Sequence, residues 1–237
     1  MATAPRMGTA PLSFWARMTI GLSIFIIFGF AQFGLRGMVD YARAPLVMHV
    51  HGVAMLAWLS LLTAQSVLAG RGGLALHMRL GWASVAMLPL IVVLASATCL
   101  VSIRAGAIPP FFTAPYFLAL IHVGVALFAA LVAAAIARRG EADWHKRLMV
   151  GSTLLLMEPA LGRVLPMPFI MPWGEWLVMI VQLGVLALIV RHDRRALGRV
   201  HPATMAVGLA IVLSHVIVEL LAITPAWIAF TARIAAA

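Results

Sequence analysis

Charged residues are scarce in this sequence, and acidic residues are the scarcest. Only 10% of the 237 residues are Asp, Glu, Lys or Arg, and 7 acidic residues stand against 17 basic ones. In a typical soluble domain about a quarter of the residues are charged. So few charges cannot cover a surface that faces water, and the composition excludes a soluble domain.

Cysteine is nearly absent. Cys99 is the single cysteine and lies inside an apolar run, so the chain forms no internal disulfide and is not a disulfide-stapled extracellular fold. The formal net charge of +10 also does not indicate nucleic acid. The basic residues stand singly or in short clusters between apolar runs, where they meet lipid head groups.

Hydrophobic residues make up 64% of the chain, and the mean hydropathy is +1.06. A helix that crosses a bilayer needs about 20 apolar residues. The runs are continuously apolar rather than alternating, which favours helices over a membrane barrel. We therefore predict an all-α integral membrane bundle, a single transmembrane domain over 1–237. Its seven expected crossings are 15–35, 45–69, 77–101, 115–137, 147–165, 173–190 and 202–223.

The basic residues are unevenly shared between the two sides of this predicted bundle. The side of the N-terminus holds Arg6, Arg17, Arg71, Arg79, Arg138, Arg139, Lys146, Arg147, Arg191, Arg194, Arg195 and Arg199. The other side holds only Arg36, Arg43, Arg104, Arg163 and Arg233. Loops rich in Lys and Arg stay in the cytoplasm. The asymmetry predicts a cytoplasmic N-terminus and an external C-terminus, in a bacterial inner membrane.

A weak internal repeat relates the second and third crossings to the fourth and fifth. The stretch 52–57 resembles 124–129, and the motif His-x-Arg-Leu begins at both His77 and His145. The offsets are nearly equal, so the two helix pairs could be parallel hairpins that form a four-helix core.

Three histidines are expected at one depth in the outer half of the membrane. At about 1.5 Å per residue, His51 and His122 lie roughly 9 to 10 Å below the outer face, and His215 lies at a similar level. His49 is two residues from His51, a rotation of about 200°, so only one of them faces the bundle interior. We favour His51 as the deeper residue.

Carboxylates accompany these histidines. Glu219 follows His215 by one helical turn, and Glu158 precedes the helix-distorting Pro159. One hypothesis is a metal site for Zn, Fe, Mn or Cu in a membrane hydrolase or oxidase, with ligands drawn from His51, His122, His215, Glu219, Glu158 and His49. Another is proton-coupled transport, in which His215, Glu219, Glu158 and Arg163 relay protons. A purely structural polar network is a third alternative.

The histidines and the helix order resemble those of the di-haem transmembrane cytochromes b, the family that includes the ascorbate-reducible cytochromes. This resemblance implies that a four-helix core binds two b-type haems, one between His51 and His122 and one between His77 and His145. It further implies electron transfer across the membrane, with a quinone, a small molecule or a partner protein as donor and acceptor. Arg79 and Arg147 would neutralise haem propionates. Whether the protein is also an enzyme stays open.

Two short segments carry a second resemblance. Leu76 to Trp82 and Trp144 to Met149 are similar to segments of uncharacterised bacterial multi-pass membrane proteins. This resemblance implies no activity. Without a ligand role, His77 and His145 are interfacial imidazoles, each beside an Arg that reaches to the lipid head groups.

Overall fold

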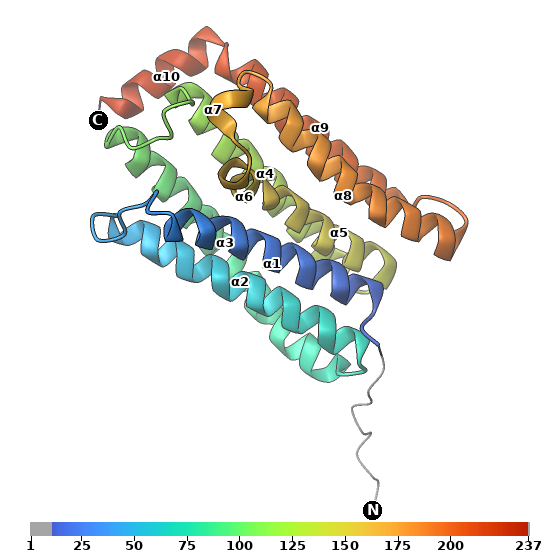
Figure 1. The fold of residues 1–237 in the computed structure, drawn as a ribbon. Helices are drawn as coiled ribbons and strands as arrows, with labels where there is room; N and C mark the ends of the chain where they lie inside the picture. Colours follow the sequence, from blue (N-terminus) through green and yellow to red (C-terminus); the bar gives the residue numbers. More distant parts are fainter. Residues whose placement is uncertain (1–10, 237) are drawn as a thin grey trace, which may run out of the picture.

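A computed structural model describes residues 11–236, and the regular structure of this part of the chain is entirely helical (Figure 1). Six helices are long and apolar enough to cross a membrane. The prediction of an all-α membrane bundle is confirmed. Arg6, which contributes to the charge asymmetry, lies outside the described residues. The six helices are α1 (Phe14–Leu35), α2 (Leu46–Gly70), α3 (Leu74–Arg104), α4 (Ala114–Ala137), α8 (Gly174–Leu197) and α9 (Pro202–Ala222).

The remaining predicted crossing, 147–165, is a broken helix. It consists of α5 (Ala142–Leu155) and α6 (Met157–Val164), followed by the single turn α7 (Met167–Ile170). Pro159 has no N–H, and its ring clashes with the carbonyl four residues earlier, at Leu155. The helix therefore breaks at Leu156, and the two pieces together connect the same ends of the bundle as the long helices do (Figure 1).

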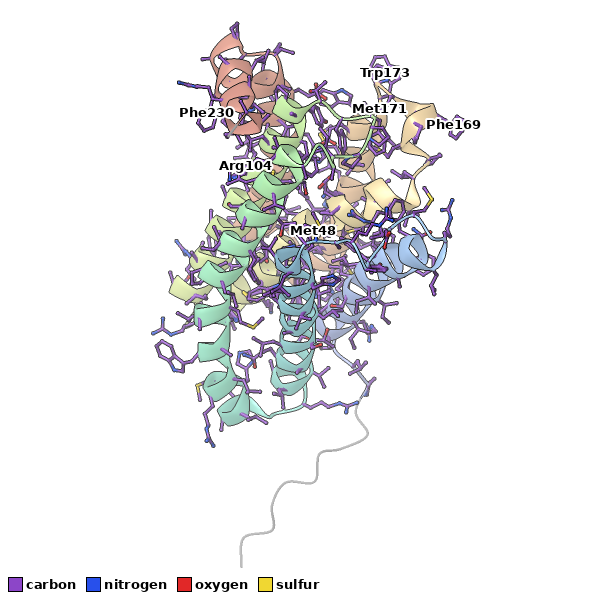
Figure 2. The ribbon with its side chains drawn as sticks, turned by 90° about the vertical axis from the view of Figure 1, so that its left-hand side faces the viewer. Met48, Arg104, Phe169, Met171, Trp173 and Phe230 are labelled. Carbon is purple, nitrogen blue, oxygen red and sulfur yellow. The ribbon has the colours of Figure 1, made fainter. Side chains whose placement is uncertain are left out.

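The helix order defines two ends of the bundle. We call the end where α1, α3, α5 and α9 begin the basic end, and the opposite end the α10 end. Helix α10 (Pro225–Ala235) was not expected from the sequence and packs against α3 and α4, with the Trp227 indole N–H donating to the Pro115 carbonyl at 2.9 Å. Phe169 and Trp173 project outward at this end and are 89% and 71% exposed (Figure 2). Exposed aromatic side chains of this kind are typical of the boundary between lipid and water.

The centre of the bundle is α5, which differs from the expected four-helix core of the second to fifth crossings. Nearly every residue from Arg147 to Leu155 is buried, and α1, α4, α8 and α9 all pack around this helix. Gly151 makes the arrangement possible, because a Cβ there would run into the side chain of Val207 on α9. Small residues allow such close helix contacts in membranes.

The two expected hairpins are present, but they do not close into one compact core. Helix α2 packs on α3, α4 packs on α5, and α3 packs on α4, whereas α2 and α5 have no extended contact. The α2–α3 hairpin therefore lies along the side of the bundle. The two hairpins are joined mainly through the contact between α3 and α4.

Candidate functional site

The structure brings His77 and His145 together at the basic end. His77 lies in the first turn of α3 and His145 in the first turn of α5, two helices without extended backbone contact. Their ring centroids are 6.1 Å apart, and the ring planes are nearly perpendicular, at 87°. Two residues that are 68 positions apart in sequence therefore meet through their side chains alone.

Each of these rings is held by a backbone carbonyl of the preceding helix. The Nδ1 of His77 lies 3.2 Å from the Gln65 carbonyl oxygen, and that of His145 lies 2.8 Å from the Ala135 carbonyl oxygen. A carbonyl only accepts hydrogen bonds, so Nδ1 carries a proton in both rings, and in the neutral ring Nε2 keeps a lone pair. In both hairpins, the histidine at the start of the second helix therefore donates a hydrogen bond to a backbone carbonyl near the end of the first helix.

The free nitrogens are suited to metal coordination. Within residues 11–236 neither Nε2 atom has a hydrogen-bond partner, and neither is enclosed as a buried unpaired atom. A nitrogen–metal bond is about 2.0 to 2.1 Å long, so two imidazoles bound to one metal from opposite sides would have ring centres about 6.4 Å apart. The observed separation of 6.1 Å is close to this value, and it also lies in the range of an ordinary edge-to-face contact between two rings. A metal-binding histidine usually donates its other N–H to a carbonyl or carboxylate, as both do here.

The second expected pair, His51 and His122, is arranged differently. The Nδ1 of His122 bonds to the Leu118 carbonyl at 2.9 Å, while the Nδ1 of His51 is buried and has no partner among the described residues. No hydrogen bond or ring stacking joins these two histidines in that part of the chain. His49 is exposed, with its Nε2 3.1 Å from the Tyr41 carbonyl, in keeping with the expectation that only one of His49 and His51 faces inward.

One face of α2 carries three buried polar atoms that lack partners within the described chain. They belong to His51, Trp58 and Gln65, which are spaced by seven residues. Seven residues make about two turns, so the three side chains share one face along the length of the helix. Trp58 contacts Phe128 of α4 edge to face, with centroids 5.5 Å apart. Since an unpaired buried polar atom costs about 1 to 3 kcal/mol, this face is suited to a bound group that would complete it.

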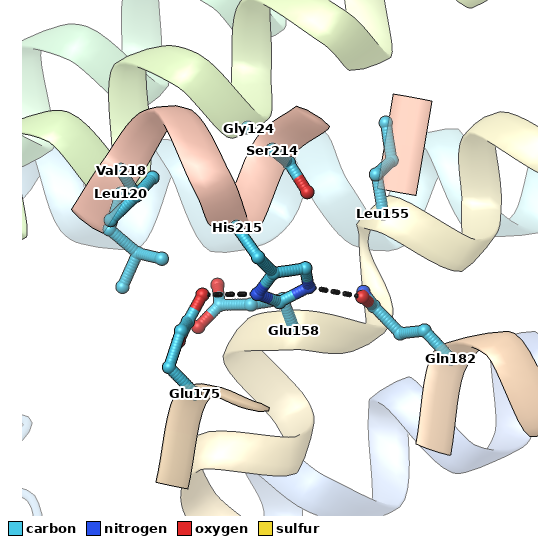
Figure 3. A pocket seen from close by; sticks show the side chains of 9 residues that line it. All are labelled: Leu120, Gly124, Leu155, Glu158, Glu175, Gln182, Ser214, His215 and Val218. Carbon is cyan, nitrogen blue, oxygen red and sulfur yellow. Dashed lines mark hydrogen bonds and ion pairs between the residues drawn. The ribbon is translucent and has the colours of Figure 1, made fainter. Parts of the chain in front are cut away.

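His215 belongs to a separate cluster (Figure 3). Its Nδ1 lies 2.5 Å from Glu175 Oε1, and its Nε2 lies 2.8 Å from Gln182 Oε1. Both partners come from α8 and are almost fully buried, at 2% and 1% exposure. Glu158 of α6 and Ser214 of α9 line the same small cavity. The sequence arguments missed Glu175 and Gln182, although their spacing of seven residues places them on one face of a predicted crossing.

The residues proposed for a metal ion do not gather at one place. His215 bonds to Glu175 and Gln182, and Glu219 lies one turn away beside Tyr116. Among residues 11–236 no group of three or more His, Cys, Asp or Glu side chains is arranged to hold a metal ion. Arg163 donates to the Pro159 carbonyl at 2.7 Å and lies over the ring of Phe30, 4.1 Å from its centroid.

Arg147 does not lie where the haem hypothesis requires it. Its guanidinium is 2% exposed and donates to Asp193 Oδ1 at 2.6 and 2.9 Å, and to Asp143 Oδ1 at 2.8 Å. Because α5 is central, this side chain faces α8 rather than the lipid head groups. The expectation that Arg147 neutralises a propionate is therefore wrong. Hydrogen bonds from Lys146 and from Arg147 lower the pKa of the exposed Asp143 carboxyl to about 2.

Comparison with known proteins finds no matching family, no similar curated protein and no similar solved structure.

Proposed function

We propose that the protein is a membrane electron-transfer protein that binds a b-type haem between His77 and His145. The observation that carries this proposal is the geometry of the two rings, 6.1 Å apart, each with Nδ1 bonded to a backbone carbonyl. Haem iron held by two histidines supplies one-electron chemistry. The two side chains would hold the group in place, and their carbonyl partners would fix the tautomer and orientation of each ring.

A haem fits this donor set better than a bare metal ion does. A structural zinc site needs four protein ligands and a catalytic one needs three, whereas a haem would need only the two histidines from the protein. In the described part of the chain, the two histidines have no third ligating side chain beside them. Arg79 is exposed at the basic end but is rotated by about 200° from His77 on α3, so its long side chain would have to reach around the helix to neutralise a propionate.

A second haem between His51 and His122 is supported by the polar face of α2. His122 has its Nδ1 bonded to the Leu118 carbonyl of its own helix, and the Nδ1 of His51 is buried without a partner in the described chain. Trp58 and Phe128 lie between the two levels. Two haems at these positions would carry electrons between the two ends of the bundle. The donor and acceptor would be a quinone, a small molecule or a partner protein.

The orientation belongs to the same proposal. Because Lys and Arg concentrate at the basic end, that end would face the cytoplasm of a bacterial inner membrane. The His77–His145 haem would then exchange electrons on the cytoplasmic side, and the His51–His122 haem on the outer side.

The test is the visible spectrum of the protein purified in mild detergent, oxidised and then reduced with dithionite, with metal analysis of the same sample. We expect a Soret band and sharp α and β bands on reduction, at one or two haems per chain. A colourless protein with stoichiometric metal would overturn the haem and favour a metal-ion site. A protein that stays colourless and metal-free after expression with added haem would overturn both.

A further inference from the structure

The cluster around His215 is not used by the proposed electron-transfer function, and its hydrogen bonds fix where protons must be. Gln182 donates its amide N–H to the Leu154 carbonyl at 2.8 Å, so its Oε1 is the atom that faces His215 Nε2. An amide oxygen only accepts. His215 must therefore carry a proton on Nε2, whatever the state of its other nitrogen.

The other side of the ring holds a second proton. The distance of 2.5 Å between His215 Nδ1 and Glu175 Oε1 requires a hydrogen between the two atoms. Either the imidazole is cationic and the carboxylate is charged, or a protonated Glu175 donates to a neutral ring. The pair keeps this proton in both forms and can pass it from one atom to the other without any change in total charge.

Glu175 also has a free position. Its Oε2 is buried and has no hydrogen-bond partner among the described residues, and the side chain is 2% exposed. The residue lines a small cavity with Glu158, Gln182, Ser214 and His215, and the rest of the wall is formed by Gly124 and three aliphatic side chains (Figure 3). An unpartnered carboxylate oxygen is costly in such surroundings unless it binds a proton or a hydrogen-bond donor. A water molecule can occupy a polar cavity of this kind.

The charged groups around the cavity do not balance without one more proton. Three carboxyl groups face it or its approach, from Glu158 on α6, Glu175 on α8 and Glu219 on α9. Arg163, which interacts with Glu158, is the cation, and the His215–Glu175 pair with its shared proton carries no net charge in either form. Tyr116 of α4 lies beside Glu175 and Glu219. Uncompensated charge is expensive in a low-dielectric interior, and the set is neutral when one carboxyl group is protonated.

We propose that Glu158, Glu175 and His215 form a buried proton-binding site that exchanges its proton with the water at the α10 end, past Tyr116 and Glu219. Glu219 lies one turn closer to this end on α9, which gives the proton a second carboxylate between the cavity and the surface. Gly124 lines the same cavity, and no atom lies within 4 Å of the position that a Cβ would take there. The site would take up and release protons independently of any haem.

The site can be tested with a hydrophobic carbodiimide, which adds to a protonated carboxyl group within the membrane and leaves an ionised one unmodified. The full-length protein in liposomes would be treated at a series of pH values, and the modified peptides quantified by mass spectrometry. We expect Glu158 or Glu175 to be modified, with a yield that falls severalfold as the pH rises. Glu141, exposed at the basic end, serves as the aqueous control and should remain unmodified.

Two variants make the result specific. Glu175→Gln and Glu158→Gln keep the size of the side chain, and each should remove modification at its own position. Infrared difference spectra of the unaltered protein, recorded after a pH jump, should show a carboxylic acid band that disappears in the variant of the exchanging residue. Absence of modification at every pH, or a yield that does not change with pH, would overturn the proposal and leave a structural network. Because neither readout requires haem, a colourless protein can be tested in the same way.

Discussion

The histidines in the two halves of the bundle are bonded in opposite ways. At the basic end, His77 and His145 each use one nitrogen for a backbone carbonyl and leave the other without a partner in the described chain. In the α8–α9 half, His215 has both nitrogens bonded, one to Glu175 and one to Gln182. The difference separates two kinds of chemistry. A ring with a fixed tautomer and a free lone pair can ligate a metal, whereas a ring between two acceptors holds protons.

The surroundings of the two histidine groups also differ in how many buried polar atoms lack a hydrogen-bond partner. Around His215 the carbonyl of Leu154 is satisfied by a side chain, and the helices fit closely around α5. Along the face of α2 that leads to the basic end, His51, Trp58 and Gln65 keep unpaired buried atoms. The α8–α9 half has a single unpaired buried atom of this kind in the described chain, Glu175 Oε2, whereas the face of α2 has three. That face is consistent with a chain that is completed by a bound group.

Removal of a basic-end ligand should have the largest effect. We expect His77→Ala and His145→Ala each to abolish haem binding at this site, because the iron would lose one of its two protein ligands. If two haems are bound, the haem-to-protein ratio should fall by about half, as measured by the pyridine haemochrome spectrum. His49→Ala, at an exposed histidine, is the matched control and should keep full haem content. Retention of all haem in both ligand variants would refute the assignment.

His215→Ala sharpens the same comparison. It should keep the haem absorbance while it removes two buried hydrogen bonds in the other half. Loss of the pigment in this variant, with the fold retained by gel filtration, would show that the two halves are not chemically separate.

The buried ion pair at the basic end should give the largest change in stability. Arg147→Met leaves the fully buried Asp193 carboxylate without its cation, and the loss of one partner of such a pair typically costs about 3 to 5 kcal/mol. The double variant Arg147→Met with Asp193→Leu should recover part of this loss, because no unpaired charge remains. Unfolding in detergent would give both values. A double variant that is less stable than the single one would contradict the reasoning.

Gln182→Met should destabilise the α8–α9 half by a smaller amount. The substitution keeps the volume of the side chain but leaves the Leu154 carbonyl and one nitrogen of His215 without partners, at an expected cost of about 1 to 3 kcal/mol. The same unfolding measurement would show it, with Gln182→Glu as the variant that retains an acceptor for His215. An unchanged stability in Gln182→Met would mean that water replaces the amide.

The sequence predicts the long helices because their apolar runs are unambiguous, whereas it predicts 147–165 as one crossing and identifies Pro159 only as a distortion, not as the cause of a break at Leu156. It does not predict α10, whose 11 residues are too few for a crossing. The depth of a residue follows from counting, so His51, His122 and His215 are expected at one level. Depth does not give the direction of a side chain, and the partners of His215 are known only once α6, α8 and α9 are packed.

Gln65→Met should have the smallest effect on the free chain, and of the opposite sign to the other substitutions. The Gln65 Oε1 atom is buried without a partner in the described structure, so its removal should raise the stability of a haem-free protein by about 1 kcal/mol, the low end of the cost of an unsatisfied buried polar atom. The His77→Ala background provides that haem-free state at the basic end. In the haem-loaded protein the same substitution should speed haem loss severalfold, as measured by transfer to an excess of apomyoglobin, because the amide would lie against the bound group. An unchanged rate of haem loss would mean that the face of α2 does not contact the haem, and that its unpaired atoms are satisfied by water.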